Sequence, residues 1–236
     1  MKNYRSQHTL VDDAASLLDA LHLASPALPI GGFAYSQGFE QAVEDGLISS
    51  AEDAYVWIRD VLLLVMGRQE LPLWMACFHA CNNNEWNDLI RWNVELIALR
   101  ETAEFKLESS QMGHSLAKLF PQWQLTQQFK SFVNDEYVWS YTAAHAALTS
   151  GAGMTSQMAM TSFLWSWLEN QVMAAVKIIP LGQNDGQNLL HRLKPAVIES
   201  MQCAENVDPE QAGTASVGLA ITSSRHESQY SRLFRS

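Results

Sequence analysis

The chain has 236 residues, a length typical of one large domain or two small ones. Charged residues make up 17% of the chain and hydrophobic residues 47%, which excludes an intrinsically disordered protein. The formal net charge of −10 argues against a protein that binds nucleic acid or an anionic membrane surface. The shortage of charge favours a globular protein whose apolar surface is covered by partners or by a second copy.

Helical periodicity dominates the sequence, and Pro or Gly ends most of the helical patterns. No run of alternating strand residues and no Asn-Gly hairpin is seen. We therefore predict an all-α, single-domain bundle of about ten helices. The predicted helices cover residues 10–23, 36–43, 50–67, 72–80, 86–110, 113–120, 135–148, 155–179, two short segments flanking Pro195, and 209–221.

Three features of the sequence bear on its compartment. The cysteines Cys77, Cys81 and Cys203 are odd in number, which argues against a secreted disulfide framework. The first residues contain no apolar signal segment. The apolar stretch 163–179 is interrupted by polar residues and is too polar for a membrane span. We expect a cytoplasmic protein without a membrane partner.

The motifs of common enzyme classes are missing. The sequence has no Gly-Lys dipeptide and hence no Walker A loop, no His-Glu-x-x-His, and no Gly-x-Ser-x-Gly. The histidines are scattered, without metal-ligand spacing. We therefore expect no catalytic residue, no cofactor and no metal site.

One alternative is a helical metal-binding or metal-storage protein. Cys77 and Cys81 are four residues apart on a predicted helix, but His79 would point about 160° away from them, and buried small side chains are the preferred interpretation. The same alternative could use three carboxylates at helical spacing, Glu101, Glu104 and Glu108. The preferred interpretation of these residues is a solvated helix face.

Three segments carry a recognisable pattern. Residues 28–40 read Leu-Pro-Ile-Gly-Gly-Phe-Ala-Tyr-Ser-Gln-Gly-Phe-Glu, a tight turn that leads into a helix. Residues 167–187 form the end of the longest predicted helix and a Pro-Leu-Gly-Gln turn. Residues 225–236 read Arg-His-Glu-Ser-Gln-Tyr-Ser-Arg-Leu-Phe-Arg-Ser. The predicted structural turn residues are Pro29, Gly31, Gly32, Pro180 and Gly182.

Together these segments resemble the urease accessory protein F (UreF) family. Arg-Glu-Thr-Ala-Glu at 100–104 and Gln-Met-Gly at 111–113 are also similar to the family. The resemblance implies an all-helical, homodimeric, non-catalytic scaffold. Its implied partners are a D-type accessory protein (called H in some systems), a G-type GTPase and apo-urease, into which the assembly inserts nickel. Modulation of GTP hydrolysis belongs to the same expectation. A generic helical adaptor unrelated to urease is the third possibility.

The resemblance also implies a two-part organisation, a helical bundle over residues 1–222 and a partner-docking tail over 223–236. We hypothesise a tail that is disordered alone and becomes ordered on the D/H-type protein, although fraying is the ordinary behaviour of a terminus. Tyr, Leu and Phe would form one apolar patch beside two Arg, residue types common at binding hot spots. The candidate docking residues are Arg225, His226, Glu227, Tyr230, Arg232, Leu233, Phe234 and Arg235.

Two further residues are candidates for a GTPase-facing surface. Glu40 follows the first turn, where a helix N-terminus alone also favours an acid. Lys177 lies on the polar stripe of the helix 155–179. Pairing of the polar side chains of this stripe with residues of neighbouring helices would explain the stripe equally well. The first motif contains no Arg to act as an arginine finger, so scaffolding is favoured over direct activation.

Overall fold

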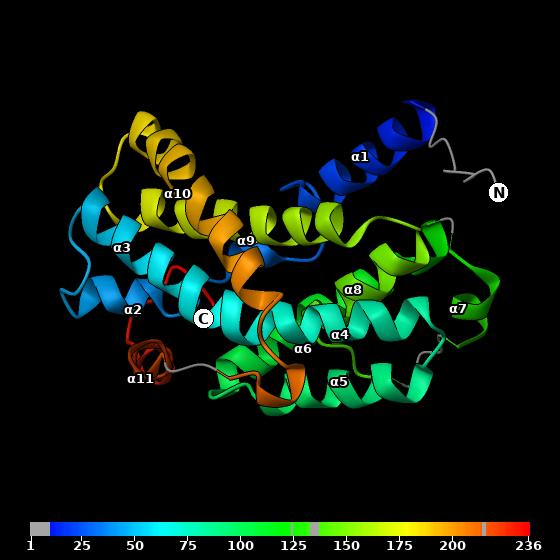
Figure 1. Ribbon diagram of the computed structural model, residues 1–236. Helices are drawn as coiled ribbons and strands as arrows, with labels where there is room; N and C mark the ends of the chain where they lie inside the picture. The colour runs from blue at the N-terminus through cyan, green and yellow to red at the C-terminus, as the bar shows by residue number, and fades with distance from the viewer. Residues whose placement is uncertain (1–9, 124, 133–136, 214–215) are drawn as a thin grey trace.

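The computed structural model describes residues 10–123, 125–132, 137–213 and 216–236. In these ranges the chain forms helices and no strand, which confirms the all-α prediction (Figure 1). The α-helices outside the long central helix are α1 Leu10–Ala24, α2 Phe39–Glu44, α5 Trp86–Ala98, α6 Ala103–Ala117, α7 Gln127–Phe132, α8 Tyr141–Gly151, α9 Ser156–Ile178, α10 Gln183–Ala204 and α11 Val217–His226.

The long central helix runs without a break through α3 (Ala51–Val61), a π-helical segment η2 (Leu62–Glu70) and α4 (Leu71–Asn82). The predicted end near Gly67 and restart at Pro72 were wrong. Pro72 cannot donate a hydrogen bond to the carbonyl of Arg68, and the N–H of Gly213 donates to that carbonyl instead, at 3.2 Å. Gly67 allows close crossing by α10, because a Cβ there would lie 3.2 Å from the carbonyl oxygen of Ser200.

Helix α8 is the most buried element, and its described neighbours α4, α6 and α9 surround it. All its residues from Thr142 to Gly151 are buried, and many of them are alanines that allow close packing. Helix α9 is also buried over much of its length, but Met173 and Lys177 are exposed.

Three other predicted boundaries were wrong. The pattern 86–110 is divided between α5 and α6, where the side chain of Thr102 caps α6 by accepting from the N–H of Phe105. Gly113 lies inside α6 rather than starting a helix. Pro195 lies inside α10 rather than between two helices, and the last helix is α11 rather than 209–221.

The central helix 51–82 is also long and apolar enough to cross a membrane by length and composition alone. However, 67% of its most apolar window is buried inside the protein, as in the core helix of a globular fold. From the sequence, only the stretch 163–179 was recognised as a possible membrane span, because the helix 51–82 was predicted as two shorter helices.

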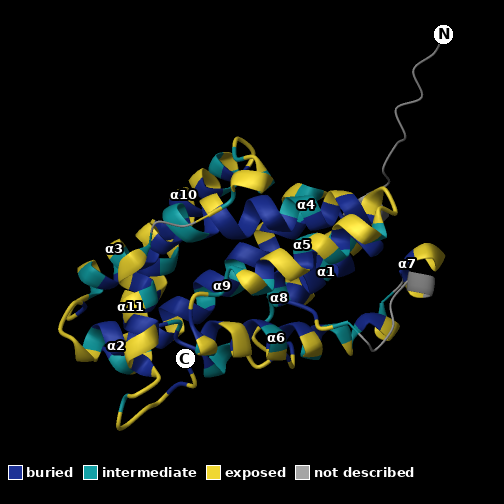
Figure 2. Cartoon of the chain, turned by 90° about the horizontal axis from the view of Figure 1, so that it is seen from below, coloured by how far each residue is buried: buried dark blue, intermediate teal, exposed yellow. Residues whose placement is uncertain are grey.

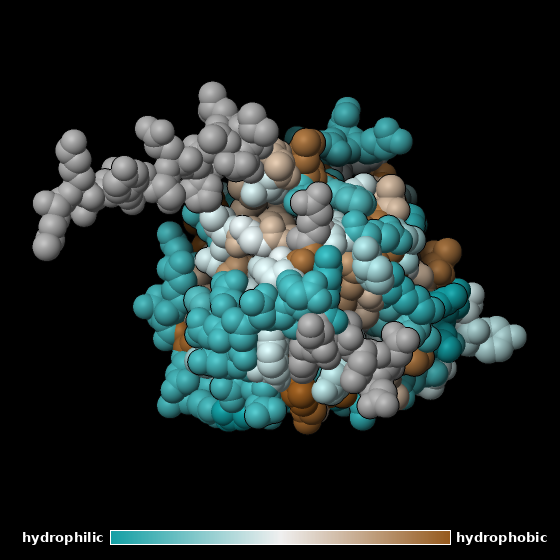
Figure 3. Space-filling view, turned by 90° about the vertical axis from the view of Figure 1, so that its right-hand side faces the viewer, coloured by the Kyte–Doolittle hydropathy of each residue, from teal (hydrophilic) through white to brown (hydrophobic). Residues whose placement is uncertain are grey.

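Of the exposed large hydrophobic side chains, three lie on α1: Leu17, Leu18 and Leu21. Figure 3 shows a face on which hydrophobic residues stand among hydrophilic ones.

Candidate functional site

The first motif forms a loop held in left-handed backbone conformations. Gly31 and Gly38 have φ of +80° and +77°, and Gln37 has φ of +56°. A Cβ on Gly38 would lie 2.9 Å from Oγ1 of Thr222, so glycine is needed where the loop passes α11. The carbonyl of Tyr35 accepts a hydrogen bond from Nδ2 of Asn170 on α9 at 3.0 Å. Part of the polar stripe of α9 is therefore satisfied internally by this loop.

Glu40 lies in the first turn of α2 and is buried, with 6% of its surface exposed. Its carboxylate accepts hydrogen bonds from the backbone N–H groups of Leu233 (2.7 Å) and Phe234 (3.0 Å). Nε2 of His226 lies 3.2 Å from the same carboxylate. Glu40 was predicted to face a GTPase, but the structure places its carboxylate under the C-terminal tail.

His226 connects the tail to a second acid. Its Nδ1 lies 2.8 Å from the carboxylate of Glu104 on α6, and its ring is fully buried. Arg232 donates from Nη1 to the same Glu104 at 2.6 Å. Because both ring nitrogens face carboxylate oxygens, only the protonated imidazolium donates to both acids. His226 thus lies between α2 and α6 and ties both of them to the tail.

The last residues of the tail attach to the first motif. Two backbone N–H groups, of Ser36 (2.6 Å) and Gln37 (3.1 Å), donate to the main-chain oxygen of Ser236, and the hydroxyl of Ser36 donates to it as well at 2.6 Å. The N–H of Arg235 donates to the carbonyl of Ala34 at 2.7 Å. Two successive N–H groups aimed at one oxygen form an anion-binding concavity.

In the structure the tail therefore packs against the body, and the hypothesis of a tail that is disordered without its partner stays a prediction. Phe234 and Ser236 are buried, whereas Leu233 and Arg235 are exposed, an alternation typical of extended backbone. Tyr230, Leu233 and Phe234 consequently do not form one patch. Tyr230 and Leu233 face solvent on the segment that leaves α11 and returns to the body (Figure 2).

The proposed boundary at residue 223 falls inside α11, which continues to His226. The tail defined by the structure is therefore the segment Glu227–Ser236. Arg225 on α11 forms an exposed ion pair with Asp45 at 2.9 Å. Glu227 accepts a hydrogen bond from the N–H of Ala103, at the start of α6, at 3.1 Å. Two of the predicted docking residues thus contact the body of the protein.

Lys177 lies near the end of α9, and its Nζ is 5.5 Å from the centre of the Phe234 ring. The two residues predicted to face a GTPase, Glu40 and Lys177, thus both contact the tail. The predicted turn residues lie in turns: Pro29 and Gly31 precede the short helix that starts at Gly32, and the turn at Pro180 and Gly182 joins α9 to α10.

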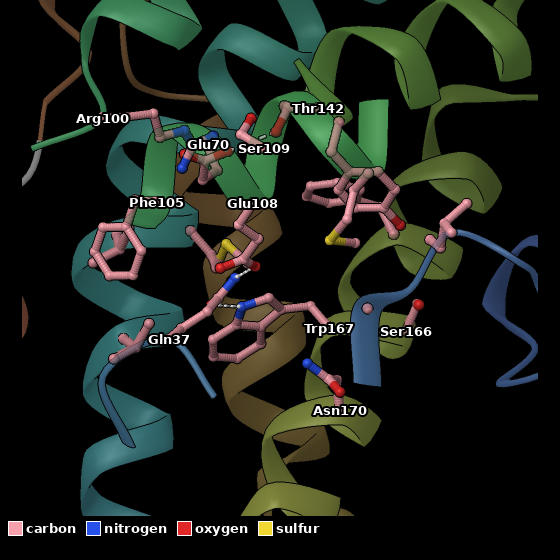
Figure 4. Close-up of a pocket in the computed structure, with 18 of the residues that line it drawn as sticks. Gln37, Glu70, Arg100, Phe105, Glu108, Ser109, Thr142, Ser166, Trp167 and Asn170 are labelled. Carbon is pink, nitrogen blue, oxygen red and sulfur yellow. Dashed lines mark hydrogen bonds and ion pairs between the residues drawn. The ribbon is translucent and has the colours of Figure 1, made fainter. Parts of the chain in front are cut away.

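A cavity of about 90 Å³ lies beside the first motif, and η2, α6, α8 and α9 contribute residues to its lining (Figure 4). Its volume suffices for several water molecules. Gln37 reaches into it and bridges two other lining residues. The side-chain N–H of Gln37 donates to Glu108 at 2.6 Å, and its side-chain oxygen accepts from Nε1 of Trp167 at 2.6 Å. Burial raises the pKa of Glu108 to about 7, and the hydrogen bonds from Gln37 and Ser236 oppose this rise.

An ion pair lies on the opposite wall of the cavity. Nη1 and Nη2 of Arg100 lie 2.8 and 2.9 Å from the two carboxylate oxygens of Glu70, and Thr142 donates to Glu70 at 2.7 Å. The hydroxyl of Ser109 is buried on the same wall, without a hydrogen-bond partner among the described residues. Neither Glu70 nor Ser109 was predicted from the sequence. The cavity is formed by segments that are far apart in the chain, so a local sequence pattern does not show which acid or serine lines it.

The residues of the metal-binding alternative do not converge. Cys77 and Cys81 are buried on α4, and burial raises the pKa of both thiols. Of the three carboxylates, Glu104 binds the tail, whereas Glu101 and Glu108 line the cavity, Glu101 as an exposed residue and Glu108 as a buried one. In the described part of the chain, no group of three or more His, Cys, Asp or Glu side chains is placed to hold a metal ion.

The segments with recognisable patterns thus meet at one place, although they are far apart in sequence. A family model described as UreF matches residues 48–194. A urease accessory protein UreF from Cupriavidus metallidurans is 41% identical over 225 residues, which cover 93% of this chain and 97% of that protein. The chain belongs to the UreF family.

Other UreF relatives agree with this assignment. A urease accessory protein UreF from Pseudomonas fluorescens is 43% identical over 220 residues, covering 92% of this chain and 97% of the relative. A bifunctional urease accessory protein UreEF from Bordetella bronchiseptica is 41% identical over 229 residues, which cover 95% of this chain and 53% of that longer protein. The names of these relatives describe accessory proteins of urease.

Proposed function

We propose that this UreF-family protein is a non-catalytic scaffold in the cytoplasm that joins a D/H-type accessory protein and a G-type GTPase for nickel insertion into apo-urease. Family membership supports the urease accessory role. The name of the Bordetella relative, which combines E and F in one chain, supports action within an assembly of accessory proteins. The scaffold acts as a homodimer and modulates GTP hydrolysis through the partner it recruits.

The observation that supports the proposal is that the tail is attached to the body while two of its apolar side chains are exposed. Glu40, Glu104 and the backbone of the first motif hold it in place, while Tyr230 and Leu233 remain 105% and 73% exposed. Exposed apolar side chains on an anchored segment lose little conformational entropy on binding, and aromatic side chains are frequent anchors at interfaces. We assign this surface to the D/H-type protein.

The GTPase-facing surface is proposed to lie beside it, around Lys177. In the structure Glu40 supports this region from beneath the tail rather than offering its carboxylate to a partner. Substitution of Glu40 would then weaken GTPase recruitment indirectly, by releasing the tail. Because Lys177 is exposed and lies over the Phe234 ring, a GTPase bound at Lys177 would lie next to the D/H-type protein on the tail.

The test is co-purification with candidate D/H-type and G-type proteins, followed by size-exclusion chromatography with light scattering. The wild-type chain should give a stable complex with two copies of this protein. The double variant Tyr230→Ala, Leu233→Ala should bind the D/H-type protein at least about tenfold more weakly, as expected for hot-spot truncation. The matched control is Val94→Ala on α5, also an exposed apolar residue, which should bind normally.

Point variants are more informative than deletion of residues 225–236. The deletion would remove His226 and Phe234 and would uncover the buried Glu40 and Glu108, so loss of the complex could follow from a damaged fold. A double variant that retains full affinity would contradict the docking surface on the tail. A wild-type chain that forms no complex with either partner would contradict the scaffold and favour the generic helical adaptor.

A further inference from the structure

The end of the tail closes over an acid in the cavity. The hydroxyl of Ser236 donates to Oε2 of Glu108 at 2.9 Å, and Gln37 donates to Oε1 of the same residue. Ser236 is 1% exposed and Glu108 is 5% exposed. Figure 4 shows Glu108 pointing into the cavity, with Gln37 between it and Trp167. Opening the tail would therefore give water access to a carboxyl group that the closed tail covers.

Closure favours the protonated form of Glu108. Burial is the main cause of its raised pKa, and Glu70 in η2 raises it further, while Arg100 and the hydrogen bonds from Gln37 and Ser236 lower it. The other titratable groups nearby are Tyr35, on the first motif, and Arg235, on the tail, whose guanidinium interacts with the Tyr35 hydroxyl. When Glu108 is protonated, the Ser236 hydroxyl can rotate to accept a hydrogen bond from the carboxyl O–H.

The tail is also attached through a second pair of acids. Nε2 and Nδ1 of His226 face the carboxylates of Glu40 and Glu104, and Arg232 also pairs with Glu104. These contacts hold the start of the tail, whereas Ser236 holds its end on Glu108.

We propose that the segment Glu227–Ser236 is a proton-linked latch, closed while Glu108 holds its proton and released as Glu108 loses it. Opening hydrates Glu108, so its pKa falls from about 7 toward the ordinary value of 4.5. The open state then binds fewer protons than the closed state between these values, and rising pH favours opening. If Glu108 regains its ordinary pKa in full, the open fraction should rise on the order of tenfold between pH 5.5 and pH 8.

The test is hydrogen exchange of the full chain, measured by mass spectrometry from pH 5.5 to pH 8.5. Exchange of the peptide that covers 227–236 is divided by exchange of the exposed turn at 82–85, which removes the intrinsic effect of pH. The wild-type ratio should rise about tenfold or more. In Glu108→Gln, a neutral residue of the same shape, the rise should be several-fold smaller, because the carboxyl group that the tail covers is gone.

A second variant separates a latch from a general loss of stability. Ser236→Ala removes the contact of the tail with Glu108 and should increase exchange of 227–236 at every pH, while α8 peptides stay protected. Equal pH dependence in the wild type and Glu108→Gln would overturn the proposal. If Glu108→Gln does not fold, a wild-type ratio that stays flat across this pH range would overturn it equally, and a tenfold rise confined to 227–236 while α8 peptides stay protected would support it.

Discussion

At the scale of single residues, Glu40 is an acid whose surroundings the sequence predicted wrongly. A carboxylate at the start of a helix is favoured by the helix dipole and is usually exposed. Here it is buried and accepts hydrogen bonds from two backbone N–H groups of a segment 193 and 194 residues later in the chain. No local pattern predicts such donors, because they come from the other end of the sequence.

Glu40→Ala should lower the free energy of unfolding by about 3 kcal/mol. The substitution leaves His226 buried beside a missing acid and two N–H groups of the tail without their acceptor, and breaking a buried charged pair is costly. Urea denaturation measures the change. Glu44→Ala, at an exposed position of the same helix, should change stability by less than about 0.5 kcal/mol. Equal effects of the two variants would contradict the anchoring role of Glu40.

Because His145 on α8 is buried, we expect the free energy of unfolding to decrease at acid pH. It accepts a hydrogen bond from Nε1 of Trp74 at 3.2 Å, and burial lowers its pKa to about 3 from 6.5. The unfolded chain therefore binds a proton that the native chain does not, so stability is lost as pH falls below about 6.5. His145 alone should contribute about 1 kcal/mol per pH unit.

This slope can be isolated by comparison with His145→Gln, whose side-chain oxygen can still accept from Trp74. Urea midpoints at pH 7, 6 and 5 should fall more steeply in the wild type. Glu108 contributes in the opposite direction between pH 4.5 and about 7, and this contribution cancels in the comparison because both proteins contain it. Parallel pH profiles would show that His145 is not held neutral.

At the scale of elements, the two internal prolines explain the wrong helix boundaries. A proline in a helical pattern usually ends or starts a helix, yet Pro72 and Pro195 lie inside helices. At Pro72, the loop residue Gly213 supplies the donor that the carbonyl of Arg68 loses. This donor comes from a segment far away in the sequence, so the sequence pattern around Pro72 could not show that the helix continues through the proline.

Pro195→Ala should raise stability by about 1–3 kcal/mol, because alanine restores a backbone donor to an exposed position in the interior of α10. The melting temperature measures this gain. Glu199→Ala, at another exposed position of α10, is the matched control and should change stability by less than about 0.5 kcal/mol. Destabilisation by Pro195→Ala would mean that the local bend is needed for the packing of α10.

Gly113→Ala should destabilise the fold by about 3 kcal/mol. A Cβ at this position of α6 would lie 2.1 Å from the carbonyl oxygen of Trp139, and backbone cannot move aside as a flexible side chain can. Gly218→Ala on α11 is the matched control, because its Cβ would meet nothing within 4 Å. This control should be neutral or stabilising by up to about 1 kcal/mol. Chemical denaturation of both variants decides the prediction.

At the scale of the whole molecule, the sequence predicted the fold class and the segments that matter, but not how they meet. Periodicity is local, and it located helices such as α1 and α9 well. The meeting of residues 28–40 with the tail depends on tertiary packing of all the helices between them. The sequence could propose docking residues on the tail, whereas the division of the tail into buried and exposed side chains required the structure.

The contact between Ser36 and Ser236 spans 200 residues, and this has a consequence for biosynthesis. Translation proceeds from the N-terminus, so the helices of the body leave the ribosome before the segment that covers Glu40 and Glu108. Closing so long a loop carries an entropic cost, and closure therefore comes last. A product of premature termination could form most of the bundle but would leave both acids and the first motif uncovered, and would be recognisable to proteases and chaperones as incomplete.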